Sequence, residues 1–155
     1  MASTQAGTPP IGPVLFAFDG SELAALAIDR AARELARGRD ALVVCVWQPV
    51  DVGFVPVSQQ HFDADQAPEV RRAAEETAAH GAALAEKAGF RSQAKAVEAA
   101  PTWKGIVETA AEAQASLIVL GAHRRRGLVG HLLGSVASAV AAHGTASVLV
   151  VHEEA

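Results

Sequence analysis

Short apolar segments alternate along the chain with longer segments in which apolar residues recur at helical spacing. Four of the short segments are apolar at nearly every position, which is typical of strands covered on both faces. A fifth alternates loosely and predicts a more exposed strand. The predicted strands are Val14–Phe18, Ala41–Trp47, Phe90–Ala99 (the exposed one), Ser116–Leu120 and Ala146–Val151.

Helices are predicted between these strands. The first begins after Ser21, a residue type that caps helix starts, and ends at Gly38. Its apolar stripe consists of Ala24, Ile28, Ala31 and Leu35. Further helices are expected over 67–88, from Pro101-Thr102 onward, and over Val136–His143. Because strand and helix alternate, we expect an α/β fold with an open parallel sheet and right-handed crossovers.

Composition and charge exclude several classes of protein. The 155 residues suit one domain, expected over residues 13–155, behind a flexible tail over residues 1–12. The formal net charge of −4 argues against binding of nucleic acid or anionic membranes, which usually needs a basic face. A single cysteine, Cys45, excludes an internal disulfide and is expected to be an inert strand residue. No signal peptide or run of ~18 apolar residues is seen, so we expect a cytoplasmic protein.

A ligand site is predicted where the carboxyl ends of the strands meet, since open α/β sheets bind ligands there. Asp19–Ser21, Trp47–Gln48 and the loop 121–135 should converge at this edge. The loop holds four glycines and three arginines and ends at a predicted helix start, which suits it to hold a phosphate. Glycines that serve only as turns, with arginines that serve only solubility, would explain the same loop without a ligand.

The chain resembles the universal stress protein family from about Val14 to Val151. The resemblance is carried by the segments 14–21, 117–122, 132–136 and 147–151. ATP-binding members have a loop of the form Gly-x2-Gly-x9-Gly-Ser/Thr, and this chain has Gly121, then Arg124 in place of the second glycine, then Gly134-Ser135. The resemblance implies a three-layer Rossmann-like fold of the adenine-nucleotide alpha-hydrolase-like type. Its five-stranded parallel sheet would have the order 3-2-1-4-5.

The resemblance also implies which residues would contact the ligand, either AMP or ATP with or without Mg²⁺. Ala17 and Val46 would border the adenine, Leu120 and Gly121 the base and sugar, and Asp19 the ribose or phosphates. The backbone would hold ribose and phosphates at His123, Arg124, Gly134, Ser135 and Val136.

Each of these positions has a structural alternative. Ala17, Val46 and Leu120 would be apolar in any sheet core, whereas Asp19 and Ser135 are residue types that cap helices. Arg124 is harmless if only its backbone N–H is used, but strained if the position requires a left-handed backbone.

No catalytic residue and no resident metal are predicted. Asp19 is the only carboxylate expected at the site, and no base stands beside Ser21 or Ser135, whereas fast hydrolysis needs metal ligands and a water-orienting residue. His123 and His131 have no carboxylate or cysteine at ligand spacing. Trp47 and Trp103 either pack in the core, which is their default, or stack on the base.

The last strand predicts a partner. In the family strand order, Ser147–Val151 lies at a sheet edge, with no proline or charge to protect it from pairing. A homodimer through this strand would cover the edge. The sequence therefore predicts a dimeric adenine-nucleotide-binding module of the stress response, with little or no turnover. The alternatives are a dimeric scaffold that has lost nucleotide binding and a slow ATPase or adenylyl-transferring enzyme on the same fold.

Overall fold

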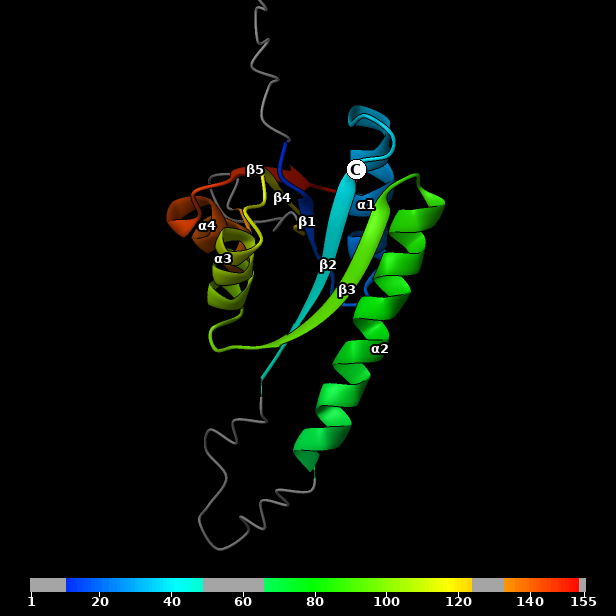
Figure 1. Cartoon of the computed structure of the whole chain (residues 1–155). Helices are drawn as coiled ribbons and strands as arrows, with labels where there is room; N and C mark the ends of the chain where they lie inside the picture. Colours follow the sequence, from blue (N-terminus) through cyan, green and yellow to red (C-terminus); the bar gives the residue numbers. More distant parts are fainter. Residues whose placement is uncertain (1–10, 49–65, 124–132, 154–155) are drawn as a thin grey trace, which may run out of the picture.

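Strands and helices alternate through the computed structural model, which describes residues 11–48, 66–123 and 133–153 (Figure 1). All strand pairs are parallel, in the order β3-β2-β1-β4-β5, which confirms the expected fold class and strand order. The elements are β1 (Val14–Ala17), α1 (Glu22–Glu34), β2 (Asp40–Trp47), α2 (Gln66–Lys87), β3 (Arg91–Glu98), α3 (Thr102–Glu112), β4 (Leu117–Gly121), α4 (Ser135–His143) and β5 (Ser147–Val151).

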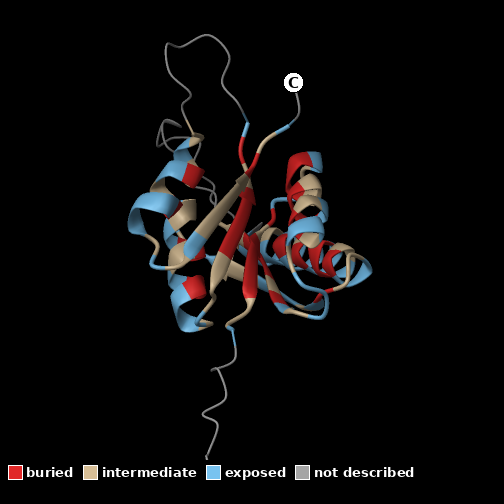
Figure 2. Cartoon of the chain, turned by 90° about the horizontal axis from the view of Figure 1, so that it is seen from above, coloured by how far each residue is buried: buried red, intermediate tan, exposed pale blue. Residues whose placement is uncertain are grey.

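The sheet is the middle of three layers. Helices α1 and α2 cover one face and α3 and α4 the other (Figure 1). Alternate strand residues supply the two cores: Phe16 and Val43 pack with α1 and α2, whereas Leu15 and Val44 pack with α3 and α4. Burial is therefore concentrated on the central strands and on the helix sides that face them (Figure 2). The outer strand β3 is mostly exposed, as its loose alternation predicts.

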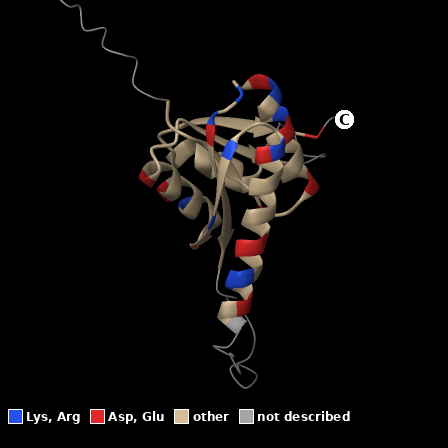
Figure 3. Cartoon of the chain, turned by 45° about the vertical axis from the view of Figure 1, so that its right-hand side comes forward, with Lys and Arg blue, Asp and Glu red and all other residues tan. Residues whose placement is uncertain are grey.

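Small residues bring α2 close to the sheet. Its buried stripe consists of alanines at 74, 78, 82 and 85. A methyl group on Gly81 would lie 2.7 Å from side-chain atoms of Phe18 and Val43, so this approach excludes any larger residue. Acidic and basic side chains are interspersed along the outer side of α2 (Figure 3). Within the described ranges, no helix is both long and apolar enough to cross a membrane.

The first helix begins as expected but ends earlier. The Ala24 amide donates to Ser21 Oγ over 3.1 Å, which confirms Ser21 as the cap. The predicted end at Gly38 is wrong, because Leu35 already has an extended backbone and α1 ends at Glu34. Leaving the helix lets Leu35 pack against the α1/α2 core. Gly38, with a φ of +77°, instead serves the turn into β2.

The segment before β1 is fastened at the edge of the sheet where the strands begin. Residues 1–10 of the predicted tail lie outside the described residues. The carbonyl oxygen of Gly12 accepts hydrogen bonds from Arg39 over 3.0 Å and from the Ser116 hydroxyl over 2.9 Å. These contacts link the segment before β1 to the starts of β2 and β4, and they leave the opposite edge free for a ligand.

Candidate nucleotide-binding site

A cavity of about 190 Å³ opens at the carboxyl ends of β1, β2 and β4, where the strand order reverses direction. This is the edge at which open α/β sheets bind ligands. Residues expected at the site from the sequence line much of it, namely Ala17, Asp19, Val46, Leu120, Gly121, His123 and Val136. Strand residues form apolar walls, while Asp19 and His123 bring polar groups to the rim.

Two expected residues are absent from the described lining of this cavity, and a third lies outside the described residues. Gly134 and Ser135 begin α4 beside Val136 but are not part of its lining. Arg124 lies outside the described residues, as do the two arginines after it. The alternative that Ser135 caps the helix is wrong, because the N-cap of α4 is Gly134. Ser135 is instead the first helical residue, with an exposed side chain.

Sequence reasoning missed the contribution of the two flanking helices. Leu23 and Ala24 of α1 and Thr102 and Ile106 of α3 line the cavity, as do Phe18 and Val44; Ser21, from the segment expected at this edge, lines it too. The sequence contains signals that could have identified Val44, Thr102 and Ile106. Val44 shares a strand face with Val46, two positions on. Thr102 follows β3, whose carboxyl end lies at the same edge, and Ile106 is one helical turn further.

In the part of the chain that the structure describes, the β2 backbone has no hydrogen-bond partner on its β1 side at Val46, beside the cavity. The last hydrogen bond between β1 and β2 runs from the Phe18 amide to the Val44 carbonyl over 2.9 Å. Trp47 turns its carbonyl the other way, to the amide of Ala99. Successive residues of a strand point their N–H and C=O groups to opposite neighbouring strands. Val46 therefore points both groups toward β1, two residues beyond Val44, which accepts the last hydrogen bond from the β1 side. The cavity thus offers one donor and one acceptor in its apolar wall.

Two close backbone approaches shape the walls. A methyl group on Gly105 would lie 3.1 Å from both Cγ atoms of Val46, so this glycine lets α3 settle onto β2. A methyl group on Gly121 would lie 2.6 Å from Leu23 Cγ and 3.0 Å from the Leu23 carbonyl oxygen. Gly121 therefore has a structural reason for being glycine, separate from any contact with a ligand.

Asp19 is exposed at the turn between β1 and α1. Its Oδ1 accepts a hydrogen bond from the Ser21 amide over 2.9 Å. The structural alternative of Asp19 as the helix cap is wrong, since Ser21 holds that position. The carboxylate of Asp19 also adds to the effect of burial on Cys45, and both raise the pKa of that thiol, with burial the larger cause. Cys45 is thus a buried, protonated strand residue, in agreement with the expectation that it is inert.

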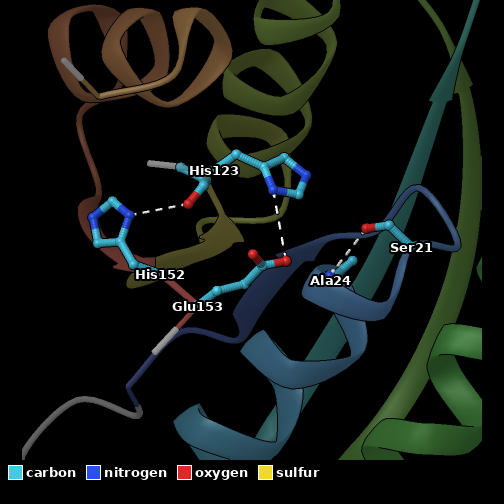
Figure 4. A network of polar contacts seen from close by, with 6 residues as sticks. Ser21, Ala24, His123, His152 and Glu153 are labelled. Carbon is cyan, nitrogen blue, oxygen red and sulfur yellow. Dashed lines mark hydrogen bonds and ion pairs between the residues drawn. The ribbon is translucent and has the colours of Figure 1, made fainter. Parts of the chain in front are cut away.

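The first residues after β4 are tied to the residues after β5 (Figure 4). The Ala122 amide donates to the Val151 carbonyl over 2.9 Å, and His152 Nδ1 lies 3.0 Å from the Ala122 carbonyl oxygen. His123 Nδ1 lies 3.6 Å from Oε1 of Glu153. The rim of the cavity at His123 is therefore set by the segment that follows the last strand.

The two tryptophans do not line the cavity. Trp47 packs with Cys45 against α2, and Trp103 stacks on His143 with ring centroids 4.3 Å apart and an angle of 17° between the rings. Packing, their default interpretation, is confirmed. At the α3 side of the cavity, Gln48 Nε2 donates to the Thr102 hydroxyl over 3.2 Å. Among the described residues, no three His, Cys, Asp or Glu side chains form a metal-ligand set.

Comparison with known proteins identifies relatives over nearly the whole chain. The model of the universal stress protein family matches residues 10–152. A universal stress protein of Mycolicibacterium smegmatis is 36% identical over 147 residues, which cover 90% of this chain and 45% of the relative. The chain thus spans about half the length of the curated relatives it matches.

Solved structures share the fold. The structure of the protein MJ0577 has a TM-score of 0.72 at 22% identity, and the match covers 93% of this chain and 97% of the other. The universal stress protein of Archaeoglobus fulgidus in complex with dAMP has a TM-score of 0.56 at 25% identity, and covers 90% and 96%. The second of these is similar to this chain and holds an adenine nucleotide.

Proposed function

This chain belongs to the universal stress protein family, and we propose that it binds an adenine nucleotide, AMP or ATP, in the cavity beyond β1, β2 and β4. The observation that carries the proposal is the pairing of apolar walls with the free backbone of Val46. A flat apolar ring that also carries hydrogen-bonding groups on its edge fits such a wall. The dAMP complex of the related A. fulgidus protein supports the adenine assignment.

The base would lie against β2 and β4. Ala17, Val46 and Leu120 would contact its faces, and the N–H and C=O of Val46 would pair with one acceptor and one donor on the purine edge. A volume of about 190 Å³ is below the range of about 300–1,000 Å³ typical of sites that enclose a whole drug-sized ligand. The cavity therefore suits the base and adjoining sugar, and the phosphates would lie outside it.

The phosphates would lie over the start of α4. The first N–H groups of a helix have no partner within it, and they favour negative charge. The N-cap of α4 is Gly134, which has no side chain, so no hydroxyl or carboxylate of the N-cap residue itself uses these donors. Among the described residues, the nearest atom to a methyl group on Gly134 would be the Ala122 Cβ, at 3.8 Å. The nucleotide would thus extend from β2 across β4 to α4.

Binding with little or no turnover fits the chemistry of the lining. Asp19 is the one carboxylate that lines the cavity in the described part of the chain, and it could meet a Mg²⁺ brought by ATP. Fast phosphoryl transfer needs a further group that positions or activates the attacking water. The described lining offers one candidate for this role, His123, whose Nδ1 lies 3.6 Å from Oε1 of Glu153.

A second part of the proposal is a homodimer through β5. In the described part of the chain this strand pairs only with β4 and is the last strand of the sheet, with Val148, Leu149 and Val150 half-buried. Antiparallel pairing with the same strand of a second copy would cover both the backbone and these side chains. The relatives are about twice as long as the matched segment, which leaves room in them for a second unit of this size.

Calorimetric titration with AMP and ATP, with and without Mg²⁺, tests nucleotide binding. The variant Ala17→Leu would fill the cavity from β1, and Ala94→Leu, on the exposed part of β3, is the matched control. We expect saturable binding to the unmodified protein and the control, and at least a tenfold loss in Ala17→Leu. Binding that survives Ala17→Leu would place the nucleotide elsewhere, and no binding at millimolar nucleotide would favour the scaffold alternative.

Sedimentation velocity tests the dimer. We expect the unmodified protein to sediment as a dimer and Leu149→Lys, a charge in the middle of β5, to sediment as a monomer. A dimer that persists in this variant would exclude β5 as the interface. Release of phosphate from ATP by the unmodified protein, and its loss in Asp19→Asn, would favour the slow-ATPase alternative.

A further inference from the structure

Glu153 places a carboxylate at the rim of the proposed nucleotide site. It lies two residues beyond β5, and its Oε1 is 3.6 Å from Nδ1 of His123, a residue that lines the cavity (Figure 4). Both side chains are largely exposed, at 72% for His123 and 60% for Glu153. The carboxylate therefore reaches the cavity without being part of its packing.

The position of Glu153 is held by neighbouring backbone contacts. Val151 and His152, directly before it, each bond to Ala122, directly before His123, over 2.9 Å and 3.0 Å. Two successive residues of one segment are thus tied to the residue beside His123. This arrangement keeps the Glu153 backbone next to the rim even when its side chain turns away from the imidazole.

The charges of the described lining are of one sign. Asp19 contributes a carboxylate, and no Lys or Arg is among the described residues that line the cavity. Glu153 adds a second carboxylate on the β4 side, where the sugar and phosphates of the nucleotide would lie. A carboxylate in contact with a lining residue is within the screening distance of about 10 Å at 0.1 M salt, so a ligand phosphate at this rim feels its charge.

We propose that Glu153 shifts the preference of the site toward a nucleoside monophosphate and away from a triphosphate. The inference rests on the proposed nucleotide binding and deepens it. Each added phosphate charge is repelled by the carboxylate, whereas an uncharged nucleoside is not. The segment after the last strand thereby acts on ligand choice without touching the base.

Removal of this charge has a calculable effect. For phosphate charge centred about 10 Å away in water at 10 mM salt, screened Coulomb repulsion predicts about threefold tighter binding of AMP and about sevenfold of ATP. The affinity for adenosine stays unchanged. Lysine at the same position replaces repulsion by attraction, so the effect of Glu153→Lys has the same direction and is larger.

The experiment is a set of calorimetric titrations with adenosine, AMP and ATP, without divalent metal, at 10 mM and 500 mM salt. The proteins are the unmodified chain, Glu153→Gln, Glu153→Lys and the control Glu86→Gln. Glu86 is an exposed residue near the end of α2, at the opposite edge of the sheet, so its replacement changes net charge equally. We expect the ATP-to-AMP affinity ratio to rise two- to threefold in Glu153→Gln at low salt, to rise further in Glu153→Lys and to stay constant in the control.

The outcomes distinguish the proposed role of Glu153 from the proposed nucleotide binding on which it rests. An unchanged ATP-to-AMP ratio in both Glu153 variants, with adenosine still bound, would overturn the role of Glu153 and leave nucleotide binding intact. A ratio shift of equal size at 500 mM salt, or in Glu86→Gln, would also overturn it, because a local charge effect is screened and position-dependent. If none of the four proteins binds any of the three ligands, the proposed function itself is wrong.

Discussion

Replacement of Gly121 by alanine tests how tightly the last residue of β4 is packed against α1. The added methyl group would lie 2.6 Å from Leu23 Cγ and 3.0 Å from the Leu23 carbonyl oxygen. Non-bonded carbon atoms prefer about 3.5–4.0 Å, so the first contact is about 1 Å too short. Leu23 is only 4% exposed, and its carbonyl belongs to the backbone of α1, so neither atom can turn away. Overpacking of this kind costs about 1–3 kcal/mol.

Urea unfolding followed by tryptophan fluorescence measures this cost. Gly134→Ala is the matched control, since within the described ranges its methyl group would meet only the Ala122 Cβ, at 3.8 Å, and its φ of −54° suits alanine. The control loses only what the weaker N-cap costs, about 1 kcal/mol or less. A Gly121→Ala protein within 0.5 kcal/mol of the unmodified one, at equal denaturant dependence, would refute the packing argument.

Three further predictions concern residues outside the cavity. His143→Ala removes the ring stacked on Trp103 and should lower the free energy of unfolding by about 0.5–1.5 kcal/mol in the same urea assay; an unchanged midpoint would contradict it. Because burial and the charge of Asp19 raise the pKa of Cys45 in the folded state, iodoacetamide should alkylate it far more slowly in folded protein than in urea. Because the pKa of Cys45 is higher in the folded than in the unfolded protein, the free energy of unfolding falls as the pH rises from the unfolded-state pKa through the folded-state pKa. Cys45→Ala should remove this loss of stability at alkaline pH. The hydrogen bond that Arg91 donates to Asp40, 2.7 Å long, lowers the pKa of Asp40. The contribution of this pair to the free energy of unfolding is therefore lost as the pH falls through the lowered pKa. Arg91→Gln should raise the pKa of Asp40 in an NMR titration, and an unchanged pKa would refute the interaction between the two side chains.

The predicted fold agrees with the structure because its signals are local. A strand with both faces covered must be apolar at nearly every position, and four of the five strands are. The loose alternation of β3 likewise reports that its outer side faces water. The miss at Gly38 has a tertiary cause: α1 ends where Leu35 gains more by packing on the core than by continuing the helix.

The candidate site was only partly predictable, because tertiary contacts bring some of its residues into place. Residues at strand ends, such as Val46 and Leu120, are brought together by any parallel sheet. Thr102 and Ile106 enter the site because Gly105 lets α3 approach β2, a fact that depends on the distance between two elements far apart in sequence. Ser135 looks like a helix cap by residue type, yet the chain uses Gly134, since the cap depends on where the backbone enters the helix.

The sequence by itself determined the order of strands and helices along the chain and the edge of the sheet at which a ligand would sit. These follow from periodicity and residue type, which act over a few positions. Only the tertiary structure decided that Gly121 is required by Leu23, that β2 leaves Val46 unpaired and that Glu153 lies beside His123. Each of these depends on distances between segments that the sheet brings together, and no local pattern records such distances.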